Sequence, residues 1–356
     1  MSRYSRGGKR RGAGFFFGRF FTALLGLLIG AGLFFWQALD SMDYVEIKAV
    51  QTNSTEGIED YIAAQQEGQD KLGKIDVDVD PDYPILVREK KDPNVENYLV
   101  FGVDSREPGE AKRADSIIVV TVATTHKHIK LASILRDTEI GLNDVNGERS
   151  KINASYVYGG VGMLINTVNS NFDLDISKFV MFDFWSAMAF VDALGGVTMD
   201  IQEREIEATN EVITDMAFLT DNNPKDFYLT APGPQKLNGV QAISWARVRY
   251  IDSDFGRTSR QRQLKETILK EFSERNKLQQ ASFAVEVLGE LETNITKSDL
   301  VSTGVSAAGF LDTIYQYYVP QEGMFYTNES NWNMIFDPET QVPDLHNFIW
   351  GDPSGE

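Results

Sequence analysis

Beyond about residue 98, most apolar residues lie either in short continuous runs or at helical spacing. Short runs rich in branched and aliphatic residues predict strands at 98–103, 116–123, 129–135, 179–182 and 197–201. Apolar positions at helical spacing predict helices at 154–170, 184–194, 237–247 and 256–275, and further ones near 277–292 and 298–311. A final aromatic region has strand character. Strands and helices are interspersed without an internal repeat, which predicts one α/β or α+β domain with a mixed central sheet flanked by helices.

The N-terminal pattern is different. Residues 1–19 carry six Lys and Arg and no acidic residue, and residues 20–39 are uncharged and mainly apolar. Twenty residues at about 1.5 Å rise span about 30 Å, the thickness of the hydrocarbon layer, so we predict a transmembrane helix at 20–39. The basic tail at 1–19 predicts a cytoplasmic N-terminus with the rest of the chain outside. A cleaved signal peptide is the alternative, although its apolar core is usually shorter and no A-x-A site follows Trp36.

Residues 40–95 lack a sustained period and are rich in Asp, Glu, Gln and Gly. We interpret them as an extracellular stalk or linker with at most one short helix or strand. The catalytic or binding domain is then predicted at 96–350.

The charge balance excludes one class of partner. Without the basic tail, 28 Lys and Arg face 52 Asp and Glu, and duplex binding draws most of its affinity from basic contacts to phosphate. We therefore expect no nucleic-acid partner. The absence of cysteine excludes disulfides and thiolate metal sites, so an exported domain of this size depends on its hydrophobic core.

A basic cluster interrupts this acidic chain. Sixteen residues contain five arginines: Arg247, Arg249, Arg257, Arg260 and Arg262. In the predicted helix at 256–275, Arg257, Arg260 and Gln261 share one face of the first turn. Cations oppose the macrodipole at a helix N-terminus, whereas a bound phosphate would be stabilised by the helix N–H groups and by the arginine forks. The pattern therefore suggests an anion site, and a solvated helix end with surface charges is the alternative.

Three predicted strands bring further polar residues together. Asp104 follows the first strand, Asp115 precedes the second, and Arg136 follows the third. If these strands are antiparallel, all three residues lie at one end of the sheet, with Arg113 beside them. Carboxylates held close together repel each other, and Mg²⁺ would relieve that repulsion. The alternative is that each Asp caps the backbone of a turn.

In combination, these segments resemble the LytR-CpsA-Psr family over about residues 96–275. The matching motifs are FGVDSR at 101–106, RADS at 113–116, SILRDT at 133–138, KINA at 151–154, YGG at 158–160, VDALGGV at 191–197, LNGVQA at 237–242 and ARVRY at 246–250, continuing to Gln261. The resemblance implies a membrane-anchored transferase that moves a glycopolymer, such as teichoic acid or a capsular polysaccharide, from a polyprenyl-pyrophosphate carrier onto peptidoglycan. A phosphodiester bond would join the two polymers.

The resemblance also implies residue roles. Asp104 and Asp115 would hold Mg²⁺, and the pyrophosphate would be bound by Arg113, Arg136, Arg249, Arg257 and Gln261, to which we add Arg260 from the helix face. Arg249 and Arg257 would also assist catalysis. Asp254 either orients or deprotonates the attacking hydroxyl or braces an arginine. Leu135 departs from the family, which often has proline there.

Two other functions fit the same residues. One is a pyrophosphatase that uses water as acceptor, and the other is a non-catalytic receptor for prenyl-phosphate lipids that organises wall assembly. Nucleotidases, zinc hydrolases and triad enzymes are disfavoured because G-x-x-x-x-G-K-[ST], H-E-x-x-H and G-x-S-x-G are all absent.

Overall fold

The computed structural model describes residues 43–47, 49–51, 83–104, 113–124, 127–141, 149–220, 223–248, 254–276, 290–299 and 314–352, and also 251, 279, 287 and 302. The predicted cytoplasmic tail and the predicted membrane span at 20–39 lie outside this part of the chain. Within it, no helix combines the length and the apolar character needed to cross a membrane.

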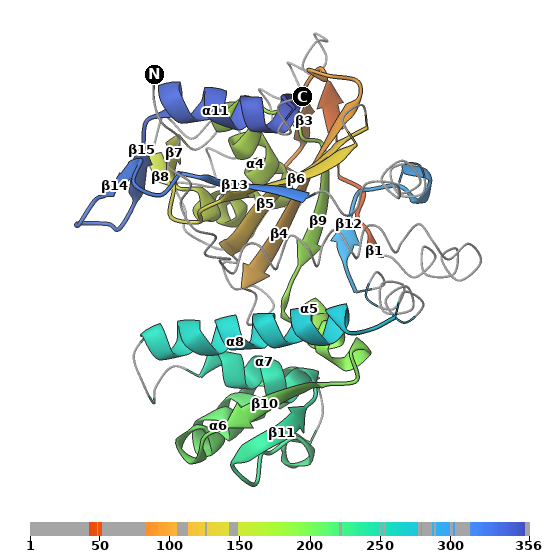
Figure 1. Cartoon of the computed structure of the whole chain (residues 1–356), viewed down its shortest axis with the longest axis vertical. Helices are drawn as coiled ribbons and strands as arrows, with labels where there is room; N and C mark the ends of the chain where they lie inside the picture. Colours follow the sequence, from red (N-terminus) through yellow and green to blue (C-terminus); the bar gives the residue numbers. More distant parts are fainter. Residues whose placement is uncertain are drawn as a thin grey trace.

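A seven-stranded mixed sheet forms the centre of the fold (Figure 1). Its strand order is β1 (Asp43–Tyr44), β12 (Glu292–Thr293), β9 (Lys178–Phe182), β4 (Val95–Asp104), β5 (Arg113–Ala123), β6 (His128–Ile134) and β13 (Ile314–Val319). Strands β4, β5 and β6 are antiparallel, while β9 is parallel to β4 and β13 is parallel to β6. The mixed-sheet prediction is therefore confirmed.

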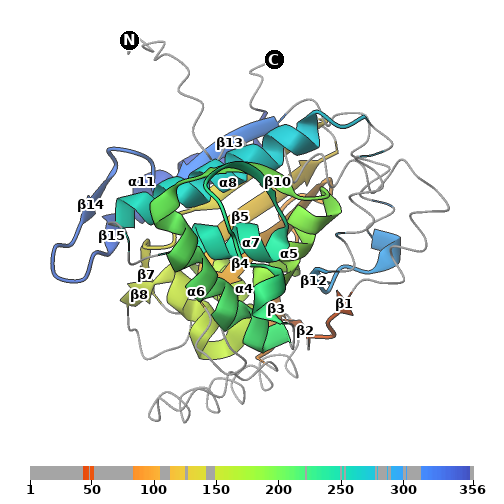
Figure 2. The same cartoon turned by 90° about the horizontal axis from the view of Figure 1, so that it is seen from below.

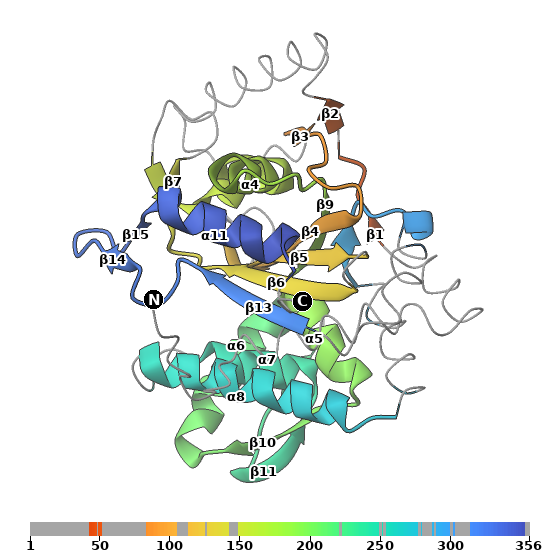
Figure 3. The same ribbon diagram turned by 45° about the horizontal axis from the view of Figure 1, so that its top comes forward.

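Helices cover both faces of this sheet. Helices α4 (Ser155–Phe172) and α11 (Pro338–Trp350) pack on one face (Figure 3). The other face is covered by α5 (Phe184–Ala193), α6 (Glu203–Thr220), α7 (Gly239–Arg247) and α8 (Asp254–Ser273), with the hairpin of β10 (Val197–Ile201) and β11 (Gly233–Leu237) beyond them (Figure 2). Strands buried on both faces need apolar residues at every position, which explains their continuous apolar runs.

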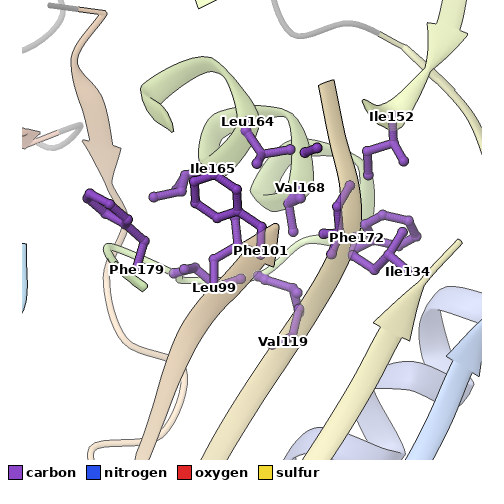
Figure 4. Close-up of a cluster of buried hydrophobic side chains, with 14 of the residues drawn as sticks. Leu99, Phe101, Val119, Ile134, Ile152, Leu164, Ile165, Val168, Phe172 and Phe179 are labelled. Carbon is purple, nitrogen blue, oxygen red and sulfur yellow. The ribbon is translucent and has the colours of Figure 1, made fainter. Parts of the chain in front are cut away.

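Alternate residues of each central strand belong to different cores. In β4, Leu99 and Phe101 face α4, where they meet Leu164, Ile165 and Val168 (Figure 4). Tyr98 and Val100 face the opposite core, formed with helices α5 to α8. This alternation follows from the two-residue period of a strand, and it makes the sheet a rigid frame between two helical layers.

Helix α6 was not predicted from the sequence. Its buried stripe is formed by Glu205, Thr209, Ile213 and Met216, so half of the buried positions are polar. A stripe of this composition gives no clear apolar period, and only the tertiary structure supplies partners for its polar groups. Asn210 fixes the loop that follows the short 3₁₀ turn η2 (Pro224–Asp226), because its side chain pairs with both backbone groups of Leu229 at 2.8 and 2.9 Å.

The C-terminal region contains the predicted strands but also the unpredicted helix α11. Strands β14 (Phe325–Thr327) and β15 (Met334–Phe336) form a hairpin before it. Asp337 caps the helix by accepting a hydrogen bond from the Glu339 N–H, and Pro338 occupies its first turn. That Asp-Pro-Glu signal was present in the sequence, but Pro343 inside the helix obscured it. The helices predicted at 277–292 and 298–311 fall largely outside the described residues.

Parts of the segment predicted as a stalk belong to the folded domain. Strand β1 is an edge strand of the main sheet, and β3 (Ile85–Val87) pairs with β2 (Ala49–Gln51). Asn166 of α4 accepts from the Leu86 N–H and donates to the Pro84 carbonyl, both at 2.9 Å. A Cβ on Gly162 would come within 1.9 Å of the Tyr83 carbonyl oxygen, so this glycine permits the close approach.

Candidate functional site

The three predicted strand ends do meet at one end of the sheet. Asp104 ends β4 and is the register partner of Arg113, which begins β5. Ile134 ends β6 opposite Ile117 of β5, so Arg136 emerges at the same end. The predicted placement is confirmed because the strands are antiparallel, while the ligand roles of these residues stay predictions. The side chain of Asp104 lies outside the described part of the structure.

Asp115 occupies a β-bulge. The pairing of β4 with β5 shifts from Gly102–Ser116 to Val103–Ala114, which leaves Asp115 as the extra residue on β5. A bulge redirects one side chain out of the regular alternation, and such irregularities are common beside active sites. The carboxylate of Asp115 is accordingly exposed at the sheet end rather than committed to either core.

The side chains of Arg136 and Asn153 contact Asp115, and Arg136 is linked through Asp137 to Lys151. We name these five residues the sheet-end cluster: Asp115, Arg136, Asp137, Lys151 and Asn153. The Arg136 guanidinium lies 3.1 Å from Asp115 Oδ2 and 3.6 Å from Asp137 Oδ2. Lys151 Nζ lies 2.7 Å from Asp137 Oδ1, and Asn153 Nδ2 donates to Asp115 Oδ1 at 3.3 Å. The cluster thus holds two cations and two carboxylates that remain partly open to solvent.

The backbone fixes this cluster. Two hydrogen bonds tie the 3₁₀ turn η1 (Ile152–Ala154) to the segment after β6, from Ile152 N to Thr138 O at 2.9 Å and from Asn153 N to Arg136 O at 3.3 Å. Just before η1, the strand β8 (Arg149–Lys151) pairs with β7 (Glu139–Gly141). The motif at 151–154 therefore lies beside the motif at 133–138 because of these contacts.

Asn153 is a site residue to which sequence reasoning assigned no role. It is buried, and its side-chain oxygen Oδ1 has no hydrogen-bond partner among the residues that the structure describes. A buried acceptor without a donor is costly, by about 1–3 kcal/mol, and usually has an explanation such as a bound ion or water. The available signal was the pair of polar residues Lys151 and Asn153 directly before an apolar helix.

Helix α8 carries the second group of predicted residues. It begins at Asp254, close to the predicted start at 256, and Arg257 and Gln261 are half-buried within its first two turns. Arg249 and the side chain of Asp254 lie outside the described part of the chain. The roles predicted for these residues in binding and catalysis stay predictions.

Arg260 has a different environment from its neighbours. Its side chain is buried, lies 3.5 Å from Glu205 Oε1 and donates to the Val248 carbonyl at 2.7 Å. Glu205 also accepts from the Trp245 indole N–H at 2.8 Å and from the Gln202 backbone N–H at 3.1 Å. Arg260 thus joins α8 to α6 and α7, a structural task that the helix-face argument did not anticipate. Its predicted role in binding pyrophosphate stays a prediction.

Arg247, another member of the arginine cluster, contacts Phe184 and Met216. Its guanidinium stacks 4.5 Å above the ring of Phe184 and donates to the sulfur of Met216 at 2.6 Å. Cation–π stacking of this kind is worth about 0.5–1 kcal/mol or more when the pair is partly desolvated. The five clustered arginines therefore do not form one uniform basic patch.

The fold and the sheet-end cluster define a mixed α/β protein with arginines and carboxylates at one sheet end, an arrangement suited to a charged, anionic ligand. The family model LytR_cpsA_psr matches residues 49–342, and the chain belongs to this family. Helix α6, the hairpin β10–β11 and the first turn of α11 lie within the matched range, so the family match extends beyond the motifs seen in the sequence.

Two relatives are both named as polyisoprenyl-teichoic acid–peptidoglycan teichoic acid transferases. The polyisoprenyl-teichoic acid–peptidoglycan teichoic acid transferase TagU of Halalkalibacterium halodurans is 32% identical over 250 residues, which cover 69% of this chain and 75% of TagU. The transferase TagV of Bacillus subtilis is 30% identical over 230 residues, covering 63% of this chain and 56% of TagV. The crystal structure of B. subtilis TagV aligns with 72% of this chain and 98% of its own, at 25% identity and a TM-score of 0.48.

Proposed function

We propose that this protein transfers a glycopolymer from a polyprenyl-pyrophosphate carrier to peptidoglycan and joins the two through a phosphodiester bond. The observation that carries the proposal is the sheet-end cluster, in which Arg136 contacts Asp115 beside the Asp104–Arg113 register pair. Family membership and the transferase name shared by TagU and TagV support it.

The proposed step balances as a single displacement. A hydroxyl of the acceptor attacks the phosphorus that bears the glycopolymer, and a new P–O bond forms. The bond from that phosphorus to the anhydride oxygen breaks, so polyprenyl phosphate leaves and the hydroxyl proton passes to a base. Phosphoryl transfer needs mainly positioning and charge neutralisation, which Arg113, Arg136 and Arg257 would supply. Asp254 would take the proton or hold one of these arginines.

Mg²⁺ is part of the proposal. In the part of the chain whose side chains are described, no group of three or more His, Cys, Asp and Glu could hold a metal. The oxygen atoms nevertheless fit a hard cation, since Asp115 is exposed at its bulge and the Oδ1 atom of the neighbouring Asn153 accepts no hydrogen bond from the described part of the chain. Asp104 and Asp115 would hold the ion together with pyrophosphate oxygens. Bound there, Mg²⁺ would offset the negative charge that develops on phosphate.

We propose that the chain crosses the membrane once at 20–39, with its N-terminus in the cytoplasm and the domain facing the wall. Protease added to intact protoplasts should then remove the domain while it spares a cytoplasmic marker. Survival of the whole chain under conditions that digest a known external protein would contradict this topology.

The transfer assay uses the full chain in detergent micelles with a polyprenyl-pyrophosphate-linked oligosaccharide. With peptidoglycan fragments present, mass spectrometry should detect an acceptor mass increased by the glycan phosphate. Release of glycan phosphate without an acceptor would support the pyrophosphatase, and lipid binding without turnover would support the receptor.

The variant Asp115→Asn tests the metal. If Asp104 and Asp115 share Mg²⁺, the variant should lose most transfer and respond less to added Mg²⁺, while its stability holds or rises because carboxylate repulsion falls. A turn-capping role predicts near-normal activity, since Asn is itself a good cap. Full transfer with an unchanged Mg²⁺ response would show that the carboxylate is structural. Asp192→Asn serves as the control, because Asp192 accepts a hydrogen bond from the Gly239 N–H in the opposite helical layer.

A further inference from the structure

The hairpin of β14 and β15 presents the two most exposed large apolar side chains in the described part of the chain. Trp332 is 69% exposed and Tyr326 is 64% exposed, and Met324, which directly precedes β14, is also exposed. Exposed aromatic residues grouped on one short hairpin are more informative than scattered ones, because burying them would lower the free energy of the protein. Figures 1 and 3 show this hairpin projecting from the edge of the molecule.

The backbone of Trp332 is unusual. Its φ is 59°, in the left-handed region, where a bulky non-glycine residue is a genuine outlier. Because the side chain is largely exposed, core packing does not explain this conformation. Strained residues of this kind cluster at sites of function, where the surrounding structure holds them in place.

The loop is held rigidly around this tryptophan. The Trp332 N–H donates to the Asn328 carbonyl at 2.7 Å, and the Asn328 N–H donates to the Asn333 carbonyl at 2.9 Å. The side chain of Asn328 accepts from the backbone and the hydroxyl of Ser330, and Asn331 accepts from the Asn333 N–H at 3.0 Å. These bonds preorganise the exposed aromatic groups, which lowers the entropy lost on binding a partner.

The hairpin is also fastened to the sheet-end cluster. The Met334 N–H donates to the Asp137 carbonyl at 2.8 Å, and Met334 forms a bridge with Thr138. The Asn333 side chain donates to Glu139 Oε2 at 2.8 Å. Asp137 directly follows Arg136, so a polymer whose reacting end lies at the cluster can extend over the hairpin.

The charge of the hairpin narrows the class of partner. Residues 321–337 contain Glu322, Glu329 and Asp337 and no Lys or Arg. A surface with this balance repels anionic lipid headgroups and polyanions, because binding to either depends on basic residues. Sugar rings remain as a suitable partner, since their C–H faces pack on aromatic rings while their hydroxyl and acetamido groups bond to nearby amides.

We infer that the hairpin at 321–337 binds the glycan strand of the acceptor, with the N-acetylated sugar rings stacked on Trp332 and Tyr326. The inference rests on the proposed transfer reaction, because it identifies the polymer that leads into the sheet-end cluster as the acceptor. The hairpin would thereby hold the strand while one of its hydroxyls reacts.

The test measures how tightly the full chain, held in detergent micelles, binds a hexamer of N-acetylglucosamine and muramidase-solubilised peptidoglycan. Trp332→Ala and Tyr326→Ala should each raise the Kd by about tenfold, as expected for aromatic residues at the centre of an interface. Trp332→Phe should retain part of the affinity. Tyr44→Ala is the matched control, because Tyr44 is 53% exposed on β1 at the other edge of the sheet.

Trp332→Gly separates function from folding. Glycine tolerates a φ of 59°, so this variant should unfold at the same temperature or higher while it loses glycan affinity. A lower unfolding temperature would assign Trp332 to the stability of the loop and overturn the inference. Wild-type glycan affinity in Trp332→Ala, or loss of binding to phosphatidylglycerol vesicles without any change for glycan, would also overturn it.

Failure of the hairpin as a glycan site and failure of the proposed transfer reaction give different results. Loss of glycan binding in Trp332→Ala, with prenyl-pyrophosphate binding unchanged, supports the inference even if the wild-type protein transfers nothing. Normal transfer to polymeric peptidoglycan by the same variant keeps the proposed function and overturns the hairpin as the acceptor site.

Discussion

Two arginine–carboxylate pairs in this protein have opposite environments. In the sheet-end cluster, the side chains of Arg136 and Asp115 are 49% and 37% exposed and their charged atoms lie 3.1 Å apart. Between α6 and α8, the side chains of Arg260 and Glu205 are 3% and 5% exposed and lie 3.5 Å apart. Solvent screens the first pair, whereas the second has lost nearly all of its hydration.

The difference indicates what each pair can do. An exposed pair contributes little to stability, about 0–1 kcal/mol, so its charges remain available to a ligand. A buried pair must satisfy its charges internally, and Glu205 does so through Arg260, Trp245 and the Gln202 backbone. Arg136 and Arg260, which were both predicted to bind pyrophosphate, are therefore suited to different tasks.

The largest expected effect comes from breaking the buried pair. Arg260→Met leaves Glu205 buried without its cation and should lower the free energy of unfolding by about 3–5 kcal/mol, measured by chemical denaturation. Lys270→Met is the control, because Lys270 forms a solvent-exposed pair with Glu274 on the same helix. A change of less than about 1 kcal/mol in Arg260→Met would show that the pair is not a structural element.

Removing the exposed arginine should affect binding instead. Arg136→Ala loses a charge-assisted contact worth about 1.5–3 kcal/mol, so affinity for a prenyl pyrophosphate should fall about ten- to a hundredfold. Its free energy of unfolding should change by about 1 kcal/mol or less. Arg257→Ala should behave in the same way. Arg149→Ala controls for net charge, since Arg149 is exposed and pairs with Glu139. Wild-type affinity in both Arg136→Ala and Arg257→Ala would reject the anion site.

The exposure of the Glu139 side chain lies between the exposures of the two pairs. The pKa of its carboxyl predicts that stability depends on pH. The hydrogen bond from Asn333 holds the pKa of the Glu139 carboxyl below its ordinary value, burial opposes this shift, and Arg149 adds to it. A depressed pKa contributes stability that is present above the unfolded-state value and is lost as the pH falls through the folded-state value. Stability should therefore decline by about 1 kcal/mol as the pH falls from about 5 toward 3.

Glu139→Gln should remove this acid dependence, which a series of thermal unfolding curves would detect. The same variant should weaken the attachment of the hairpin at 321–337, because the Asn333 side chain donates a hydrogen bond to Glu139. An identical acid profile in the variant and the wild type would assign the decline to other carboxylates.

The smallest effect is expected for Lys151, whose ammonium is partly exposed beside Asp137. Lys151→Met should change the free energy of unfolding by about 0.2–1 kcal/mol. A loss above about 2 kcal/mol would place this pair with the buried one and weaken the contrast between the two environments.

Much of the site could be predicted because its placement follows from strand direction. The strands that carry Asp104, Asp115 and Arg136 are short, apolar and consecutive, so an antiparallel arrangement brings their ends together. Helix α8 was also predictable from its apolar spacing. Asn153 could not be predicted, because its place beside Asp115 and the lack of a partner for its Oδ1 atom among the described residues follow from the tertiary structure.

The sequence alone determined the elements whose signal is local: the central strands, helices α4, α5, α7 and α8, the acidic charge and the family resemblance. Tertiary structure decided where polar groups find partners. Arg260 is buried against Glu205, and the buried face of α6 is half polar. Residues 83–87 pack on α4, and the hairpin at 321–337 is hydrogen-bonded to Asp137. The physical reason is that apolar periodicity is repeated along the chain, whereas the partner of a buried charge or amide comes from a distant segment.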